Sequence, residues 1–199
     1  MKTVVALFDD LTDAYDAIED LRDAGLAAED VSLVARDVEE RYAEELDTYD
    51  EDVADGAAAG AVGGGIVGGL LGFLVGLGAF AIPGVGPVIA AGPLASALVG
   101  AGIGAAAGGL LGALIDWGVP EAEAEYYTEG VRRGGTLVAV RATDTVADRA
   151  RDILYRHNPV DIEERAALWR EELGWTGYDV EAEPYTADEI RTYRQRYVR

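Results

Sequence analysis

The residues from Gly56 to Ile115 carry no ionisable side chain, and this uncharged block constrains the fold more than any other feature of the sequence. It is about 60 residues long, roughly three times the length that a transmembrane helix needs. The chain has 199 residues and a net charge of -21, from 37 acidic and 16 basic side chains. All of these charges lie in the flanks, so the sequence combines an uncharged, glycine-rich block with a very acidic head.

Glycine recurs at every fourth position over two parts of the uncharged block. A step of four keeps residues on one face of a helix, so the pattern predicts two helices that pack along stripes of glycine. Each interior glycine costs roughly 0.8–1 kcal/mol relative to alanine, and only close backbone contact with another helix offsets that cost. The predicted helix-packing residues are Gly60, Gly64, Gly68, Gly72, Gly76, Gly100, Gly104, Gly108 and Gly112.

The segment Ile82-Pro-Gly-Val-Gly-Pro87 separates the two glycine series and predicts the reversal of a helical hairpin. Its turn residues are Pro83, Gly84, Gly86 and Pro87. Residues 61–79 are apolar enough for a membrane span, whereas the acidic flanks and the wholly apolar loop at 82–94 argue against one. Three surroundings for the hairpin stay open: a membrane, the interior of a homo-oligomer, or the core of one chain.

The flanks predict an α+β head. In residues 1–37, an apolar strand at 4–8 precedes a helix capped by Thr12 and closed by Gly25, and a strand follows at 31–35. The second flank repeats this order with a strand at 136–140, a helix at 146–154, and a short strand at Val160 and Ile162. Two such β-α-β units predict a ferredoxin-like split β-α-β sandwich with its helices on one face of the sheet.

Further helices are expected on both sides of the second unit. Pro120 opens one that ends at Gly134-Gly135, residues 166–173 form another, and the capping box Thr186-Ala-Asp-Glu189 begins a last helix over 187–197. The expected organisation is a half-head at 1–37, an acidic linker or exposed helix at 38–55, the helical hairpin at 56–117, the second half-head at 118–165, and a helical extension at 166–199.

Several strings of the sequence resemble bacterial general stress proteins of the YflT-like class. They are the opening strand-helix-strand, the inserted hairpin with Ile82-Pro-Gly-Val-Gly-Pro-Val-Ile-Ala-Ala-Gly-Pro93, and Gly118-Val-Pro-Glu-Ala-Glu-Ala-Glu-Tyr-Tyr-Thr-Glu-Gly-Val-Arg-Arg-Gly-Gly135. The resemblance covers about residues 1–165. It implies expression under heat, salt or oxidative stress, and it supplies no catalytic residues.

The sequence gives little support for catalysis or for a metal or cofactor site. The absence of cysteine excludes a thiolate zinc site and a cysteine nucleophile, and His157, the only histidine, is expected to interact with a helix C-terminus. Asp9, Asp10 and Asp13 are interpreted as turn and first-turn residues. The acidic segment 44–55 lacks calcium-loop spacing, and the glycine runs at 63–65 and 100–104 lack the lysine of a phosphate loop.

The charge also limits the partners and the location of the protein. A chain this acidic is poorly suited to binding nucleic acid. The exception is the C-terminal helix, where arginines interleaved with tyrosines could touch RNA or anionic lipid; they are Arg191, Arg194, Arg196 and Arg199. Lys2 is the only lysine, which fits either a salt-rich cytosol or GC-biased codons. The N-terminus does not resemble a signal peptide, so a cytoplasmic location is expected, with membrane association left open.

The function expected from the sequence is therefore non-enzymatic. We expect a stress-response protein whose glycine-striped hairpin drives membrane association or homo-oligomeric assembly, with the acidic α/β head in the cytoplasm. The alternative is a carrier or sensor in which clustered hairpins enclose an apolar ligand such as a lipid or a quinone.

Overall fold

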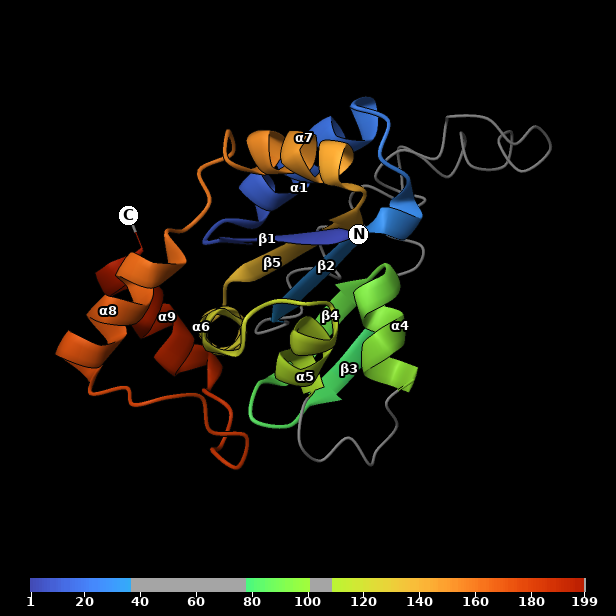
Figure 1. Ribbon diagram of the computed structural model, residues 1–199. Helices are drawn as coiled ribbons and strands as arrows, with labels where there is room; N and C mark the ends of the chain where they lie inside the picture. The colour runs from blue at the N-terminus through green and yellow to red at the C-terminus, as the bar shows by residue number, and fades with distance from the viewer. Residues whose placement is uncertain (37–77, 101–108, 199) are drawn as a thin grey trace, which may run out of the picture.

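The computed structural model describes residues 1–36, 78–100 and 109–198. In these residues the protein is a mixed α+β structure built on a five-stranded antiparallel sheet (Figure 1). The strand order is β1-β5-β2-β4-β3, and each neighbouring pair is antiparallel. The strands are β1 (Lys2–Phe8), β2 (Val31–Arg36), β3 (Gly78–Ile82), β4 (Gly86–Ala91) and β5 (Thr136–Ala142).

Helices cover both faces of this sheet. Figure 1 shows α1 and α7 above the sheet, α4, α5 and α6 below it, and α8 with α9 beside α6. The described helices are α1 (Leu11–Asp23), α4 (Pro93–Gly100), α5 (Gly109–Asp116), α6 (Glu121–Arg132), α7 (Asp144–Leu154), α8 (Ile162–Leu173), α9 (Ala187–Tyr197) and the short 3-10 helix Ala28–Asp30.

Side chains that alternate between the two faces of the sheet divide the hydrophobic core into two layers. In β1, Val4, Ala6 and Phe8 pack with the apolar stripes of α1 and α7, whereas Leu7 packs with α4, α5 and α6. Side chains in a strand point alternately to opposite faces, so an apolar run such as Val-Val-Ala-Leu-Phe can serve both layers at once. The sheet is therefore the middle layer of three.

The first predicted β-α-β unit is confirmed, with one correction at the start of its helix. The N-cap of α1 is Asp10 and not Thr12, because the Asp10 carboxylate accepts a hydrogen bond from the Thr12 backbone N–H at 2.9 Å. Gly25 ends the helix as predicted and has a φ of +88°, which glycine adopts without strain. Strands β1 and β2 lie on either side of β5.

The second unit departs from the prediction after its helix. Strand β5 and helix α7 form as expected, but the strand predicted at Val160 and Ile162 is absent from the described structure. Val160 makes one backbone hydrogen bond to β1, from its N–H to the carbonyl of Leu7 at 2.7 Å. Pro159 offers no N–H, and the Asp161 side chain caps α8 by accepting from the Glu164 N–H. The chain therefore turns into α8 at Ile162, four residues before the predicted start of that helix.

Residues 78–91 of the uncharged block form the β-hairpin β3-β4, whereas the sequence predicted the end of a helix followed by a loop at 82–94. Pro83 and Gly84 lie in its turn as predicted, and the Val85 N–H donates to the Ile82 carbonyl at 3.1 Å. Gly86 and Pro87, which were also predicted in the turn, are instead the first two residues of β4. Gly84 has a φ of +73°, as the third position of a type II turn requires. The two prolines exclude a continuous helix, and the β-branched residues at 82, 85, 88 and 89 favour strands.

The other predicted C-terminal elements are confirmed. Helix α6 begins directly after Pro120 and ends at Arg132, before Gly134 with its φ of +92°. Helix α9 spans 187–197, and both hydrogen bonds of the capping box between Thr186 and Glu189 are present.

The glycines at 60, 64, 68, 72, 76, 104 and 108 and the acidic segment 38–55 lie outside the described residues, so their predicted roles stay predictions. Across residues 1–36, 78–100 and 109–198, no helix combines the length and the apolar character that crossing a bilayer requires.

Candidate functional site

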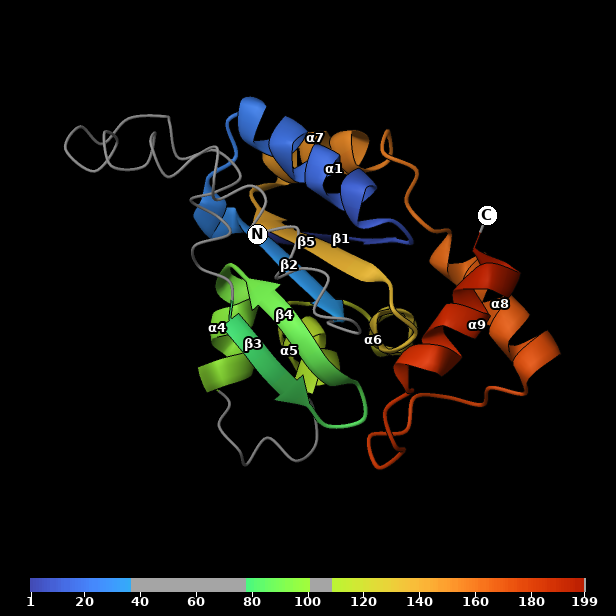
Figure 2. The ribbon, with the colours of Figure 1, turned by 180° about the vertical axis from the view of Figure 1, so that it is seen from behind.

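The described part of the uncharged block gathers at one end of the sheet. We call residues 78–100 and 109–115, which contain β3, β4, α4 and most of α5, the uncharged edge. In Figure 2, β3 is the outermost strand, and α4 and α5 lie behind the hairpin. Among the described strands, β3 pairs only with β4, so its other side is an edge.

The register of the hairpin shows which backbone groups face this edge. Ala81 lies opposite Pro87, which has no N–H to donate. In an antiparallel pair, such a position is a non-hydrogen-bonded one, and its residues direct their backbone groups away from each other. The N–H and C=O of Ala81 therefore point to the free side of β3. The Ala81 side chain is also exposed.

The helices of the uncharged edge are only partly covered. Leu94, Leu110 and Leu114 are fully buried and anchor α4 and α5 to the sheet. Leu98 and Leu111 are partly exposed, and Ile115 is 38% exposed. The edge therefore combines backbone that has no partner strand in the described part of the chain with apolar side chains, and it carries no charge that would repel a neighbour.

The predicted turn and packing glycines have unequal surroundings. A Cβ at Gly84 would lie 2.6 Å from the Tyr178 hydroxyl, so this glycine lets the C-terminal loop approach the hairpin. The Tyr178 hydroxyl donates to the Pro83 carbonyl at 3.0 Å. Gly86 faces Arg36, with 2.8 Å between its virtual Cβ and the guanidinium. Beyond its own helix, Gly112 in α5 has no atom of the described residues within 4 Å of its virtual Cβ.

A second cluster, which the sequence did not predict, joins β2, α6 and the C-terminal loop. Glu129 on α6 is fully buried, and its carboxylate lies 3.3 Å from Arg132 Nη1 and 2.7 Å from Arg133 Nη2. Arg36 at the end of β2 donates to the Arg132 carbonyl at 2.9 Å and to the Tyr185 carbonyl. We call Arg36, Glu129, Arg132 and Arg133 the arginine cluster.

The arginine cluster contains more positive than negative charge. All three arginines are less than 10% exposed, and Glu129 is the one carboxylate buried with them in the described structure. Burial, and next the positive charge of Arg132, lower the pKa of Arg36. The Nε atoms of Arg36 and Arg132 are buried, and neither has a hydrogen-bond partner among the described residues.

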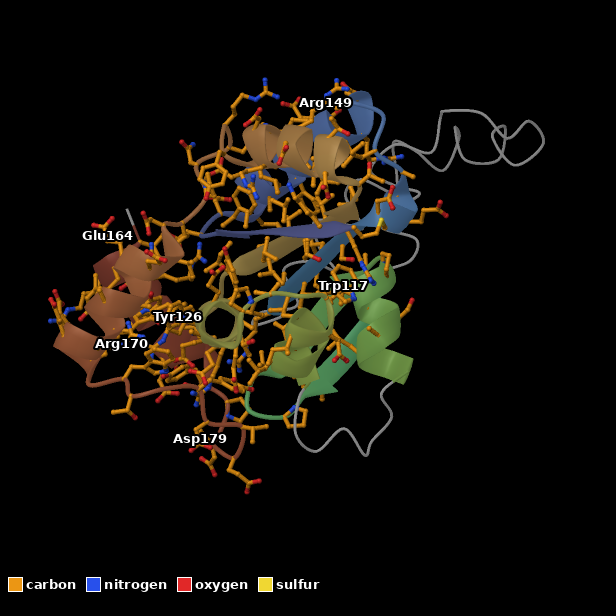
Figure 3. The ribbon with its side chains drawn as sticks, in the orientation of Figure 1. Trp117, Tyr126, Arg149, Glu164, Arg170 and Asp179 are labelled. Carbon is orange, nitrogen blue, oxygen red and sulfur yellow. The ribbon has the colours of Figure 1, made fainter. Side chains whose placement is uncertain are left out.

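Aromatic rings also stabilise the buried positive charge of the arginine cluster. The Arg133 guanidinium lies 5.1 Å from the ring centre of Trp169, 5.0 Å from that of Tyr185 and 5.4 Å from that of Tyr193. On the outer side of α6, Arg170 from α8 donates to the Tyr126 hydroxyl at 2.6 Å (Figure 3). Cation–π contacts of this kind hold α8 and α9 against α6.

The remaining candidate residues have structural contacts. The His157 ring lies 3.0 Å from the Asp20 carboxylate and joins the end of α7 to α1. Asp9 receives two hydrogen bonds from Arg165, at 2.6 and 3.0 Å, and so ties the end of β1 to α8. Within the described ranges, no three His, Asp or Glu side chains are grouped as metal ligands.

Comparison with known proteins adds no assignment: no family model, curated protein or solved structure matches the chain. The resemblance to general stress proteins therefore stays a prediction.

One sequence signal for the arginine cluster existed. Glu129 precedes Arg132 and Arg133 by three and four residues, the spacing at which side chains on a helix meet. The same spacing is common on solvated helices, so only the packing of β2 and the C-terminal loop against α6 shows that these three residues are buried.

Proposed function

We propose that this protein is a non-enzymatic assembly protein that associates with copies of itself through the uncharged edge. The observation that carries the proposal is the outer side of β3, which pairs with no described strand and toward which the backbone groups of Ala81 point, on a strand without charges. Strands exposed in this way are the usual templates for edge-to-edge pairing.

The charge of the chain favours a second copy as the occupant of this edge. With a net charge of -21, two copies repel each other over most of their surfaces. They approach at lowest cost where neither copy carries charge, and the uncharged edge is such a surface. Anionic lipid headgroups would also repel so acidic a head, which makes membrane association the less favoured arrangement.

The head itself supports a ferredoxin-like interpretation. Strands β1 and β2 flank β5 with both neighbours antiparallel, and α1 and α7 share one face of the sheet. We propose that this part is a split β-α-β plan that has lost the last strand beside β1 and has gained β3 and β4 at the other edge. The role in a stress response and the cytoplasmic location rest on the sequence alone.

The experiment that tests the proposal is light scattering on the full chain, purified from the soluble fraction without detergent. We expect the wild-type protein to form one defined oligomer. High salt should strengthen it, because salt screens the repulsion between acidic heads. A wild-type monomer at all protein concentrations, or a protein that needs detergent for extraction, would overturn the proposal.

Two substitutions at one position locate the interface. Ala81→Glu places a charge on the edge, and Ala81→Pro removes the outward N–H without breaking a bond to β4. Both variants should dissociate the oligomer. The matched control is Ala167→Glu, which makes the same change in net charge at an exposed position on α8. If Ala81→Glu and Ala167→Glu assemble alike, β3 is not the contact.

A further inference from the structure

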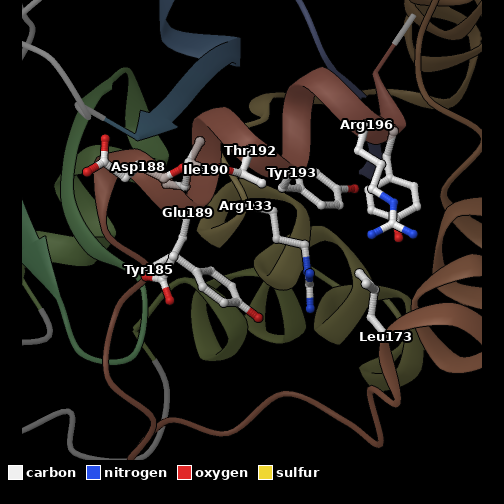
Figure 4. A pocket seen from close by; sticks show the side chains of 10 residues that line it. Arg133, Leu173, Tyr185, Asp188, Glu189, Ile190, Thr192, Tyr193 and Arg196 are labelled. Atoms are coloured by element: carbon white, nitrogen blue, oxygen red, sulfur yellow. Dashed lines mark hydrogen bonds between the residues drawn. The ribbon is translucent and has the colours of Figure 1, made fainter.

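A cavity of about 380 Å³ lies between α9 and the arginine cluster (Figure 4). It is lined by Arg133 at the C-cap of α6, by residues of α8 and α9, and by the C-terminal loop. Three tyrosine rings and two aliphatic side chains make up half of the lining, and charged or polar side chains make up the other half. Arg133 is one of the lining residues, and Figure 4 shows this side chain between Tyr185 and Leu173. The volume is within the range of small-molecule sites in proteins.

Among the described residues, Arg133 uses only two of its three nitrogens in hydrogen bonds or ion pairs. Its Nε and Nη2 both approach Oε1 of Glu129, at 2.7 Å each. In the described structure its third nitrogen, Nη1, has no hydrogen-bond partner. A second cation, Arg196, also lines the cavity and lies 5.3 Å from the ring centre of Tyr197. A ligand in the cavity can therefore meet two arginines.

The charge around the cavity selects the class of ligand. The arginine cluster holds three arginines against the buried carboxylate of Glu129, and the exposed Glu189 adds a second negative charge that acts on Arg36 and Arg132. One positive charge is left over, so a single additional negative charge would be stabilised there. Asp188 and Glu189 also line the cavity and would repel a doubly charged group such as a phosphate monoester. Tyr193 and Tyr197, whose ring centres are 5.4 Å apart, offer flat surfaces for an aromatic body.

From this geometry we propose that the cavity binds small aromatic monocarboxylates, with the carboxylate on Arg133 or Arg196 and the ring against the exposed faces of the tyrosines. This site is formed by α6, α8, α9 and the C-terminal loop, and none of its lining residues belongs to the uncharged edge. The proposal is therefore independent of self-assembly, and Ala81→Glu should leave binding unchanged.

The test is isothermal titration of the full chain with 2-naphthoate, and with 2-naphthamide as the uncharged probe of the same shape. We expect saturable binding of the acid and at least about tenfold weaker binding of the amide, because only the acid forms charge-assisted hydrogen bonds. No saturable binding of 2-naphthoate, or equal affinity for the two probes, would overturn the proposal.

Variants then locate the site. Arg196→Gln changes an exposed side chain and should weaken 2-naphthoate binding about fivefold, because one charge-assisted contact is lost. Arg133→Lys keeps the positive charge beside Glu129 but loses the planar fork, and it should weaken binding about tenfold while the circular dichroism spectrum is unchanged.

The control Arg151→Gln removes an exposed arginine from α7, in the opposite helical layer, and should bind as the wild type does. Thr192→Trp, at an exposed position of the lining, should block the cavity and abolish binding. If Arg196→Gln and Thr192→Trp both bind 2-naphthoate as well as Arg151→Gln does, the cavity is not the site.

Discussion

Glu129→Gln removes the only carboxylate that the described structure buries among three arginines. The Glu129 side chain is 0% exposed, and its two ion pairs have N–O distances of 3.3 and 2.7 Å. At an effective dielectric constant of about 20, each pair contributes roughly 5–6 kcal/mol of Coulomb attraction. Most of that attraction offsets the cost of burying the three charged groups.

Glutamine keeps the shape and one acceptor oxygen but leaves Arg132 and Arg133 buried without a counter-charge. Breaking a buried ion pair from one side costs about 3–5 kcal/mol, and we expect Glu129→Gln to lower the free energy of unfolding by this amount. Because a domain of this kind has about 5–15 kcal/mol of stability in total, the variant should fold but unfold at a clearly lower urea concentration.

The assay is urea unfolding followed by tryptophan fluorescence, which reports on the cluster because Trp169 packs over Arg133. Measurements in the Ala81→Glu background separate unfolding from dissociation of the proposed oligomer. The matched control, Glu172→Gln, changes an exposed residue of α8 and should alter stability by less than about 0.5 kcal/mol. A loss below about 1 kcal/mol in Glu129→Gln would refute the electrostatic role assigned to the cluster.

Three further predictions concern the backbone, the response to pH and a helix cap. Gly92 and Gly25 have similar positive φ values, +82° and +88°. A Cβ at Gly92 would lie 2.1 Å from a carbonyl oxygen of β2, whereas a Cβ at Gly25 would have no described atom within 4 Å. Gly92→Ala should therefore cost at least about 3 kcal/mol and Gly25→Ala about 1–2 kcal/mol in urea unfolding, and equal costs would contradict the contact. Burial raises the pKa of Tyr178 to about 12 from 10.0, so the unfolded chain loses this proton first and stability should fall as the pH rises from about 10 through 12. Tyr178→Phe should reduce this alkaline loss, and an unchanged pH profile of unfolding would contradict the assignment. Thr186→Ala breaks the capping box of α9 and should cost about 1 kcal/mol, with a smaller helical signal in circular dichroism; an unchanged spectrum and stability would show that the cap contributes nothing.

The parts of the head that local signals determine could be predicted from the sequence. The capping box at Thr186 gave the start of α9, Pro120 gave the start of α6, and Gly25 gave the end of α1. These signals act within one or two turns of the chain, where backbone hydrogen bonding and φ preferences decide the structure.

The β-hairpin could not be predicted in the same way, because its sequence satisfies two patterns. Residues 78–91 are apolar and rich in glycine and alanine, so they resemble both a buried helix and a buried strand. Pairing of β4 with β2, at Leu33 opposite Ala91, is a long-range contact that no local pattern encodes.

The arginine cluster is a second case in which long-range packing decides. Arg36 lies 96 residues from its acceptor at Arg132, and Glu183 and Tyr185 close the cluster from the C-terminal loop. In sequence, each of these residues is typical of a solvated surface. The C-terminal loop that covers Arg36 and Arg132 also packs against Gly84, where a side chain would leave no room for the Tyr178 hydroxyl.

The central claim is that β3 is the strand through which copies of the chain meet. Amide hydrogen exchange of the segment 78–91, measured at a low and a high protein concentration, tests it most directly. We predict that amides of β3, with Ala81 among them, exchange more slowly at the high concentration in the wild type and at one rate at both concentrations in Ala81→Glu. Exchange of β3 that is independent of concentration in the wild type, while light scattering shows an oligomer, would contradict the account.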